Sequence, residues 1–294
     1  MTLEQRLAVC RERVDPALER FLPADGEVPT RLVAAMRHAL SGGKRLRPFL
    51  CMEAARAFGL RPETVLPTAC GLEMLHCATL VHDDMPCVDD SDLRHGRAAC
   101  HVEFDEATAL LAGDALIIGA FECLTRQAEE PDIAPERVLR CVRELAEYTG
   151  VRGLVVGEAL DIETEGRPCT ESELEFIHLN KTAKLIICSS RSGAVLAGAP
   201  DDQLARLSEY AEALGLLFQI TDDLLDVDGD TASTGKPVGA DAAAGKATYP
   251  GLLGLAAARE RAELFGARAL QSAKGLPNRE VWEALVEFVV KRRH

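Results

Sequence analysis

The longest amphipathic pattern in the chain lies between residues 204 and 225, where mostly apolar side chains recur at alternating steps of three and four. The residues of this stripe are Leu204, Leu207, Ala211, Leu214, Phe218, Thr221 and Leu225. Because an α-helix has about 3.6 residues per turn, this spacing places them all on one side of a helix. The pattern therefore predicts one long helix with a single buried face.

The same period continues through most of the sequence. Further predicted helices cover residues 2–21, 30–40, 46–58, 65–84, 105–128, 135–149, 170–190 and 279–292. No segment alternates apolar and polar residues as a half-buried strand would. The longest stretch without a helical pattern, residues 229–247, is rich in Gly, Asp and Lys, and loops of that length usually carry a function. We expect an all-α fold in one domain spanning residues 1–294.

Composition and charge exclude two classes of protein. Among 294 residues, 33 Lys and Arg face 47 Asp and Glu, which gives a net charge of −14. Such a chain repels polyanions, so nucleic acid is not expected as a partner. Hydrophobic residues make up 47% of the chain, which is enough to bury a core and excludes an intrinsically disordered protein.

The cellular compartment follows from two further features. The N-terminus has no apolar signal segment, and no stretch reaches 18 uncharged apolar residues, so we expect a cytoplasmic protein without a transmembrane segment. The ten cysteines are scattered singly, with no CxxC pair. Reduced, mostly buried thiols are therefore expected in place of disulfides or a zinc site.

Two aspartate clusters stand far apart in the chain. The first reads Asp-Asp-Met-Pro-Cys-Val-Asp-Asp over residues 83–90, and the second reads Asp-Asp-Leu-Leu-Asp over residues 222–226. On a helix, the three aspartates of the second cluster and Gln219 fall within an arc of about 100°, so they share one face. In the first cluster Pro86 disrupts the helix, and ideal helix geometry does not predict where Asp89 points.

Crowded carboxylates repel one another, by about 4 kcal/mol for two charges about 4 Å apart at an effective dielectric constant of 20. A counter-ion is therefore expected. Oxygen ligands favour Mg²⁺ or Mn²⁺ over zinc, and Mg²⁺ completes its coordination with water and phosphate oxygens. A lone cluster is more often a solvated helix face, but two clusters, each ending an apolar helix, indicate a metal site for a phosphorylated ligand.

Basic residues supply the complementary charge. Residues 41–48, Ser-Gly-Gly-Lys-Arg-Leu-Arg-Pro, form a glycine turn that enters a helix and offers backbone N–H groups and cations to an anion. The turn lacks the spacing of a Walker A loop. Lys181, Lys236 and Lys246 are individually unremarkable, since isolated lysines are more often solvated than bound to a ligand.

In their order and spacing, these residues resemble the trans-prenyl diphosphate synthases of the short-chain farnesyl and geranylgeranyl branch. The resemblance covers nearly the whole chain and rests on residues 42–48, His76, both aspartate clusters, Arg94, Lys181-Thr182, Gln219 and Gly235-Lys236. It implies an all-α, single-domain bundle of about ten or more helices around a deep central cavity, of the isoprenoid synthase type, and a homodimer. It also implies head-to-tail (1′-4) condensation of isopentenyl diphosphate with an allylic diphosphate, giving C15 farnesyl or C20 geranylgeranyl diphosphate.

The resemblance also implies roles for individual residues. The expected ligands of up to three Mg²⁺ (or Mn²⁺) ions are Asp83, Asp84, Asp89, Asp222, Asp223 and Asp226. The expected substrate-binding residues are Lys44, Arg47, His76, Arg94, His95, Lys236 and Lys246. Lys44, Arg47 and His76 are expected to bind isopentenyl diphosphate, and Arg94 and Lys236 the allylic diphosphate. Lys181, Thr182 and Gln219 are the expected catalytic residues: Lys181 holds the allylic diphosphate, and the other two border the carbocation that forms.

Three positions depart from the family pattern: His95, Glu158 and Lys184, to the last of which we assign no role. His95 stands where short-chain members usually carry an arginine that helps bind isopentenyl diphosphate. Since one charge-assisted hydrogen bond is worth about 1.5–3 kcal/mol, we expect weaker and more pH-sensitive binding of that substrate. Glu158 stands where glutamine is common, and it either adds negative charge near the first cluster or is an ordinary paired helix carboxylate.

Product length depends on the residues four and five positions before the first aspartate, which line the tunnel for the growing chain in this family. Here they are Thr79 and Ala78. These small side chains leave room for a further isoprene unit and favour C20 over C15.

Two other functions remain open at this stage. A class I terpene cyclase also ionises a diphosphate with an aspartate-rich helix, but its second metal motif normally mixes Asn, Ser or Thr with Glu. A non-catalytic regulatory subunit of a prenyl synthase typically loses one or both clusters, whereas both are complete here.

Overall fold

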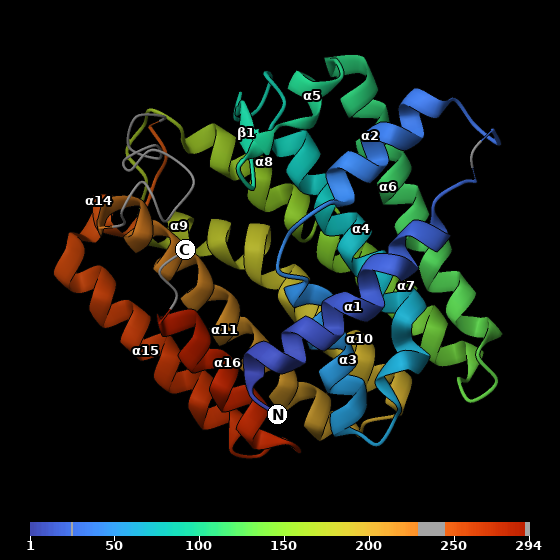
Figure 1. The fold of residues 1–294 in the computed structure, drawn as a ribbon. Coiled ribbons are helices and arrows are strands. Elements are labelled where there is room, and N and C mark those ends of the chain that lie inside the picture. The colour runs from blue at the N-terminus through green and yellow to red at the C-terminus, as the bar shows by residue number, and fades with distance from the viewer. Residues whose placement is uncertain (25, 229–244, 292–294) are drawn as a thin grey trace. The chain divides into compact units, whose positions relative to one another are not determined.

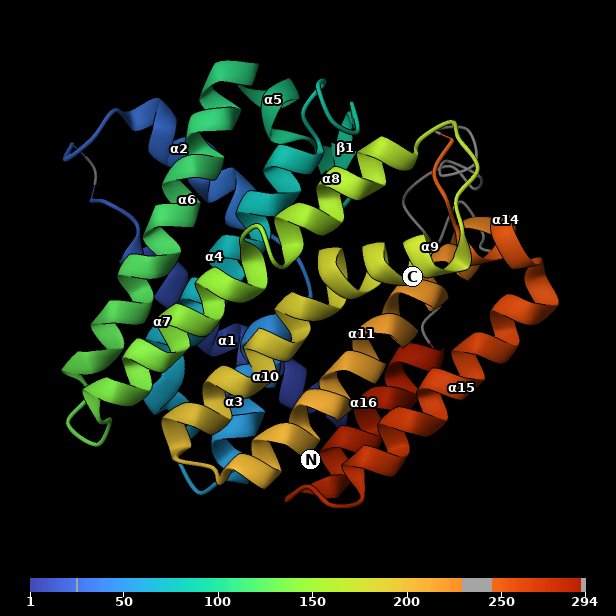
Figure 2. The same cartoon turned by 180° about the vertical axis from the view of Figure 1, so that it is seen from behind.

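The computed structural model describes residues 1–24, 26–228 and 245–291, and it is almost entirely helical (Figures 1 and 2). The α-helices are α1 (Leu3–Phe21), α2 (Thr30–Leu40), α3 (Leu46–Ala57), α4 (Leu66–Asp83), α5 (Cys100–Glu103), α6 (Glu106–Arg126), α7 (Pro135–Thr149), α8 (Leu154–Thr164), α9 (Glu171–Ile177), α10 (Lys184–Ala197), α11 (Asp201–Asp228), α14 (Tyr249–Leu253), α15 (Leu255–Ala273) and α16 (Arg279–Lys291). The remaining elements are the 3₁₀ helices η1 (Pro62–Val65) and η2 (Gln127–Glu129), the π-helix η3 (His178–Ala183), and the strands β1 (Leu93–Arg94) and β2 (Arg97–Ala98).

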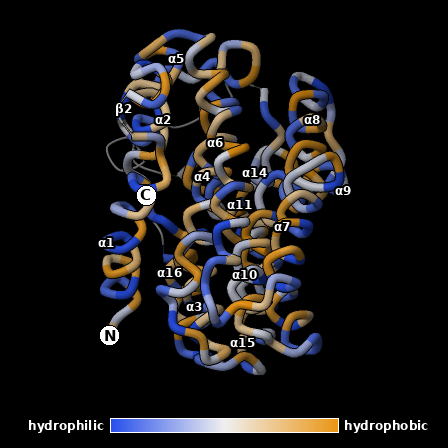
Figure 3. The backbone as a smooth tube through the Cα atoms, turned by 90° about the vertical axis from the view of Figure 1, so that its right-hand side faces the viewer, coloured by the Kyte–Doolittle hydropathy of each residue, from blue (hydrophilic) through white to orange (hydrophobic). Residues whose placement is uncertain are grey.

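The chain divides into two compact units. Unit 1 contains residues Met1–Val142 and Ser192–Gly198, and unit 2 contains Arg143–Arg191 and Ala199–His294. Hydrophilic and hydrophobic stretches alternate along helices such as α1 (Figure 3), as expected for helices that cover a core with one face.

Unit 1 is built around α4, which packs against α6, α3, α1 and α2. Most of α4 is buried, so the helix is apolar on nearly every side, as a central core helix must be. Helices α4 and α6 lie side by side (Figures 1 and 2). They approach closely at Gly71, where an added Cβ would lie 2.5 Å from a methyl carbon of Leu124 and 2.6 Å from the carbonyl oxygen of Ala120.

Unit 2 is built around α11, which packs against α15, η3, α16 and α14. The predicted stripe is buried over its first two thirds, while Phe218 and Leu225 are only half-buried near the aspartate cluster. In the first half of the helix the Tyr210 hydroxyl donates a 2.9 Å hydrogen bond to the carbonyl oxygen of Trp282 in α16. The aspartates therefore lie near the C-terminal end of a helix whose first half is anchored in the core.

The structure confirms the predicted helices within a few residues at their ends, except that the helical stretch predicted at 170–190 continues to Ala197. The predicted helix 170–190 is three elements, because the π-helix η3 interrupts it between α9 and α10. Sequence analysis missed α5, α8, α14 and α15, and it predicted no strand. The short hairpin β1–β2 corrects that last point.

Most of the segment expected to be a loop, residues 229–244, lies outside the described residues. The ten cysteines are all free thiols, and eight of them are buried, as predicted.

Two described helical segments, Pro62–Asp83 and Glu106–Glu129, are long and apolar enough to cross a membrane by length and composition alone. In the first, 72% of the most apolar window is buried inside the protein, as in a core helix. In the second the figure is 39%. This weak signal does not establish a membrane span, and the cytoplasmic location stays a prediction.

Candidate functional site

The first aspartate cluster lies in unit 1, where α4 ends. The helix stops at Asp83 because Pro86 follows, and the chain then turns back on the helix end. The Asp89 N–H donates a 2.9 Å hydrogen bond to the carbonyl oxygen of Asp83. This bond places the first and third aspartates of the cluster side by side, and both are partly exposed.

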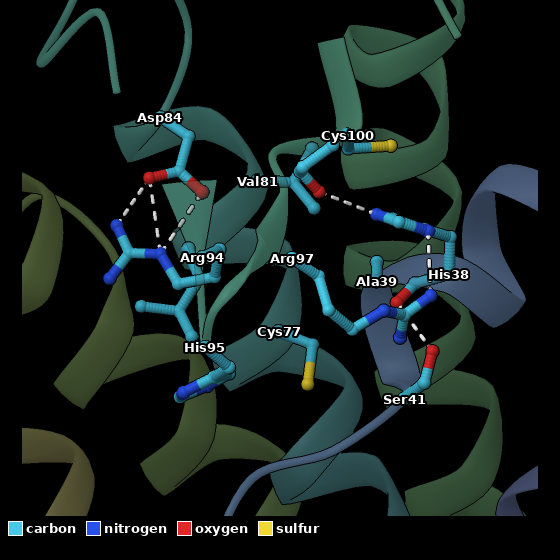
Figure 4. Close-up of a pocket in the computed structure, with 12 residues that line it drawn as sticks. His38, Ala39, Ser41, Cys77, Val81, Asp84, Arg94, His95, Arg97 and Cys100 are labelled. Atoms are coloured by element: carbon cyan, nitrogen blue, oxygen red, sulfur yellow. Dashed lines mark hydrogen bonds and ion pairs between the residues drawn. The ribbon is translucent and has the colours of Figure 1, made fainter. Parts of the chain in front are cut away.

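Asp84 differs from its neighbours because it is buried, with 2% of its surface exposed. Its carboxylate accepts hydrogen bonds from Arg94 of β1, with Nε lying 3.1 Å from Oδ1 and 3.0 Å from Oδ2, and with Nη2 also donating to Oδ1 (Figure 4). Burial acts to lower the pKa of Arg94, but the hydrogen bond and charge of Asp84 raise it overall. Arg94 therefore stays charged, and its hydrogen bonds to Asp84 tie the hairpin to the aspartate cluster.

The hairpin connects its strands through His95 and Gly96. Both residues have positive φ, 53° and 73°, as a two-residue type I′ turn requires. The turn brings Nε2 of His95 to 3.9 Å from the position that a Cβ on Gly43 would occupy. His95 thus lies against the glycine turn of residues 41–45, where the resemblance places isopentenyl diphosphate.

The other residues expected to bind isopentenyl diphosphate lie in the same unit. Lys44 is exposed, while Arg47 at the start of α3 and His76 on α4 are partly buried. Burial and the positive charges of Arg47 and its neighbours hold the pKa of His76 well below its ordinary value. A neutral imidazole at this point can donate one hydrogen bond to a phosphate oxygen without adding charge.

The second aspartate cluster lies in unit 2 on α11. Asp222 is exposed and Asp226 is partly exposed, whereas Asp223 is buried with 2% of its surface exposed. Oδ1 of Asp223 accepts a 3.0 Å hydrogen bond from Nε2 of Gln219, and Oδ2 accepts one of 3.0 Å from the backbone N–H of Tyr249. The buried aspartate thus ties α11 to the start of α14.

The network extends to the predicted catalytic residues. The Thr182 hydroxyl donates a 2.9 Å hydrogen bond to Oε1 of Gln219, so the two residues expected to border the carbocation are in direct contact. Lys181 lies next to them, and its Nζ is 2.9 Å from Oε1 of Glu158 and 2.7 Å from Oδ2 of Asp161. Glu158 is therefore a paired carboxylate on α8, the second of its two expected alternatives.

The π-helix η3 presents Lys181 and Thr182 from a wider turn than an α-helix has, and such turns are frequent at functional sites. Two glycines allow neighbouring helices to approach it. A Cβ on Gly157 of α8 would lie 2.3 Å from the Lys181 nitrogen, and a Cβ on Gly215 of α11 would lie 2.6 Å from Cα of Ala183. Close packing on both sides fixes the position of these side chains.

Sequence analysis missed three residues of this network: Asp161, His178 and Tyr249. The ring of His178 lies 5.2 Å from that of Tyr249, and its Nε2 is 3.8 Å from Oδ2 of Asp223. Burial lowers the pKa of His178 to about 3, against a smaller opposite effect of Asp161. The i, i+3 spacing of Glu158 and Asp161 was the one local signal for this group.

The residues expected to set product length lie on α4. Ala78 is fully buried, and the partly exposed Thr79 donates a 2.8 Å hydrogen bond from its hydroxyl to the carbonyl oxygen of His76. Lys236 lies outside the described residues. Lys246 is among them and is partly exposed.

Within unit 1, Asp84, Arg94 and His95 also line a cavity of about 30 Å³, shown in Figure 4. That volume has room for a few water molecules.

Among residues 1–24, 26–228 and 245–291, no group of three or more His, Cys, Asp or Glu side chains is arranged to hold a metal ion. The donor set nevertheless fits Mg²⁺. In each cluster one aspartate is buried, and other carboxylates lie at partly or fully exposed positions. Mg²⁺ needs few carboxylates when water and phosphate oxygens complete its octahedron.

An all-α fold with an aspartate cluster at the end of each of two core helices is the fold of isoprenoid synthases. The solved structure of an FPP/GFPP synthase from Zymomonas mobilis matches this chain with a TM-score of 0.86 and 33% sequence identity, covering 98% of both chains. Residues 29–284 match the family model described as polyprenyl synthetase. The chain belongs to this family and is a prenyltransferase.

Two curated relatives show how closely the chain matches. A farnesyl diphosphate synthase from Geobacillus stearothermophilus is 44% identical over 89% of this chain and 88% of its own. Geranylgeranyl pyrophosphate synthase 11 from Arabidopsis thaliana, a chloroplast protein, is 42% identical over 90% of this chain and 74% of its own. Prenyl synthases of this family use isopentenyl and allylic diphosphates and divalent metal ions.

Proposed function

We propose that this chain is a Mg²⁺-dependent short-chain trans-prenyl diphosphate synthase. It condenses isopentenyl diphosphate with allylic diphosphates head to tail (1′-4) and releases geranylgeranyl or farnesyl diphosphate. The observation that carries the proposal is that each cluster combines a buried aspartate with exposed or partly exposed ones. Asp84 and Asp223 are buried, while Asp83 and Asp89 are partly exposed and Asp222 is exposed.

The exposed and partly exposed carboxylates of the two clusters would hold up to three Mg²⁺ ions. Bound Mg²⁺ supplies positive charge that stabilises the departing diphosphate of the allylic substrate. Arg94, Lys181 and Lys236 hold that diphosphate from the protein side, assisted by Lys246. Lys181 is already oriented by Glu158 and Asp161.

Thr182 and Gln219 direct their oxygen dipoles towards the allylic cation that forms when the C–O bond breaks. Lys44, Arg47, His76 and His95 hold isopentenyl diphosphate so that its double bond attacks this cation. Apolar helices around the site exclude water, which would otherwise trap the cation as an alcohol. The proton lost from the condensed product passes to the released diphosphate, so no protein base is required.

The active form is proposed to be a homodimer. Leu110, Leu111 and Ile118 on α6 are 48%, 57% and 70% exposed. These large apolar side chains on one helix support an interface with a second copy, because such side chains gain from burial.

One product analysis tests the proposed function. The protein is incubated with radiolabelled isopentenyl diphosphate and each of the C5, C10 and C15 allylic primers, with and without Mg²⁺. We expect C15 or C20 diphosphates only when Mg²⁺ is present. Conversion of farnesyl or geranylgeranyl diphosphate without isopentenyl diphosphate would instead identify a terpene cyclase, and activity only after mixing with another synthase would identify a regulatory subunit.

Substitution of Ala78 by phenylalanine is expected to shorten the main product by one isoprene unit. Ala78 is fully buried on α4, and a phenyl ring occupies the space that the growing chain requires. Chromatography of the dephosphorylated products measures the change. Ala78→Gly serves as the control and retains the wild-type length. An unaltered product from the folded phenylalanine variant would contradict the role of Ala78.

Substitution of His95 by arginine is expected to lower KM for isopentenyl diphosphate by about 10-fold or more, since a permanent charge strengthens one hydrogen bond to phosphate. The pH dependence of this KM should also flatten between pH 5 and 8, where histidine ordinarily changes its charge. Steady-state kinetics at saturating allylic substrate measures both effects. An unchanged KM for isopentenyl diphosphate would show that His95 does not contact this substrate.

A further inference from the structure

Arg45 adopts an unusual backbone conformation at the point where the glycine turn enters α3. Its φ and ψ are 54° and 38°, in the left-handed region, which costs a residue other than glycine about 1–3 kcal/mol. The side chain is also buried, with 4% of the residue exposed. A strained backbone and a buried charge persist together only where surrounding contacts hold them.

The contacts that hold Arg45 come from three different segments. Its Nε donates a 2.7 Å hydrogen bond to Oδ1 of Asp15 on α1, and its Nη1 donates one of 2.9 Å to Oε1 of Glu73 on α4. Its Nη2 donates one of 2.5 Å to the carbonyl oxygen of Leu40 at the end of α2. The Asp15 side chain is largely exposed, whereas Glu73 is as buried as the arginine, so the pair with Glu73 is the stronger constraint.

Glu73 connects this contact to the expected substrate-binding residues. It precedes His76 by three positions on α4, and therefore lies about one helical turn from it. Its charge also reaches Arg47, where it acts to raise a pKa that burial lowers overall. An added Cβ on Gly43 would lie 3.8 Å from Nη1 of Arg45 and 3.9 Å from Oε1 of Glu73. The ion pair thus lies directly against the turn.

We propose that Arg45 and Glu73 are positioning residues for isopentenyl diphosphate. Their ion pair fixes the position of the glycine turn with Lys44, and of the start of α3 with Arg47, relative to His76 on α4. This role rests on the proposed function and deepens it, because it assigns substrate affinity to two residues that do not themselves bind the substrate.

Arginine is required at position 45 because its planar guanidinium directs separate donors to three acceptors at once. Lysine retains the charge but concentrates it at one nitrogen. The Oε2 atom of Glu73 is buried and accepts no hydrogen bond from the described residues, so this carboxylate depends strongly on its contact through Oε1. Substitution of Arg45 therefore removes the hydrogen bond from its guanidinium to Glu73, and the turn is no longer held against α4.

A second buried arginine–glutamate pair provides a matched control. In unit 2, Nε and Nη2 of Arg191 lie 2.8 and 2.7 Å from the carboxylate oxygens of Glu144, and Nη1 lies 2.8 Å from the Ser208 hydroxyl. Both side chains are largely buried. No residue of this pair is expected to meet substrate, so Arg191→Lys reports the general cost of changing such a pair.

The experiment compares Arg45→Lys, Glu73→Gln and Arg191→Lys with the wild-type protein. For each, KM is measured for isopentenyl diphosphate and for the allylic substrate, together with kcat and the melting temperature. We expect the first two variants to raise KM for isopentenyl diphosphate about 10-fold or more while the other kinetic constants change less than about twofold. The double variant should have a KM for isopentenyl diphosphate no higher than that of the more affected single variant, because both changes break the same ion pair.

Two results would overturn the positioning role. One is an unchanged KM for isopentenyl diphosphate in folded Glu73→Gln, a variant that keeps the shape of the side chain. This variant also tests the role if Arg45→Lys does not fold. The other is a parallel loss of all kinetic constants that Arg191→Lys reproduces. A wild-type protein that forms no condensed product would overturn the proposed function and this role together, whereas an active wild type with unaffected variants would overturn only the positioning role.

Discussion

Replacement of Asp222 by asparagine is expected to lower kcat by about 100-fold or more, because one fixed group that stabilises developing charge is typically worth a factor of about 10²–10³. Asp222 is exposed on α11, whereas its neighbour Asp223 is buried and bonded to Gln219 and Tyr249. Asparagine preserves the shape of the side chain and removes only its charge. The variant should therefore need more Mg²⁺ for half-maximal rate while keeping its fold.

Steady-state rates over a Mg²⁺ titration measure this effect. The melting temperature without metal shows whether the variant is folded. Asp202→Asn, at the exposed start of the same helix, is the control and should keep the wild-type kcat. Wild-type kcat and Mg²⁺ dependence in Asp222→Asn would remove this residue from the proposed metal site.

Replacement of Gly157 by alanine is expected to damage both stability and catalysis. A Cβ at this position would lie 2.3 Å from the Lys181 nitrogen and 2.9 Å from the Asn180 carbonyl carbon, both backbone atoms that cannot rotate away. Overpacking of this kind costs about 1–3 kcal/mol of folding free energy. Displacement of η3 by about 1 Å would lower kcat about 100-fold, since Lys181 and Thr182 lose their alignment.

Urea denaturation and steady-state kinetics measure the two effects. Gly266→Ala on α15 is the matched control, because the nearest atoms to its added Cβ are 3.9 Å away, an ordinary contact distance. There the change should be neutral or stabilising by up to about 1 kcal/mol, since alanine favours a helix interior over glycine. If Gly157→Ala behaves like this control, the close packing of η3 is not required for activity.

The sequence alone was sufficient for the helical class and for most helix positions. The three-and-four spacing from Leu204 to Leu225 predicted the buried face of α11, and Pro86 correctly marked the end of α4 at Asp83. Both signals are local, because they depend only on neighbours within one or two turns. The order of the aspartate clusters and basic residues was likewise enough to indicate the family.

The elements that the sequence missed have weaker local signals. The buried residues Ala258, Phe265, Ala269 and Ala273 of α15 follow a helical spacing, but three of the four are alanines, so their hydrophobic contrast is low, and the helix packs along α11. The π-helix within residues 170–190 follows from close contacts with Gly157 and Gly215, which belong to other segments of the chain. The hairpin of β1 and β2 is too short to show an alternating pattern, and the backbone of its turn fixes its register.

The two aspartate clusters separate what sequence and tertiary structure each determine. The sequence alone determined which carboxylates lie together on a helix or turn, because spacing along the chain sets that arrangement. Only the tertiary structure decided that Asp84 is bound by Arg94 and that Asp223 is bound by Tyr249, which lies 26 positions away. Every aspartate in a cluster is chemically identical, so its role depends on which distant donor the packed fold brings within hydrogen-bonding distance.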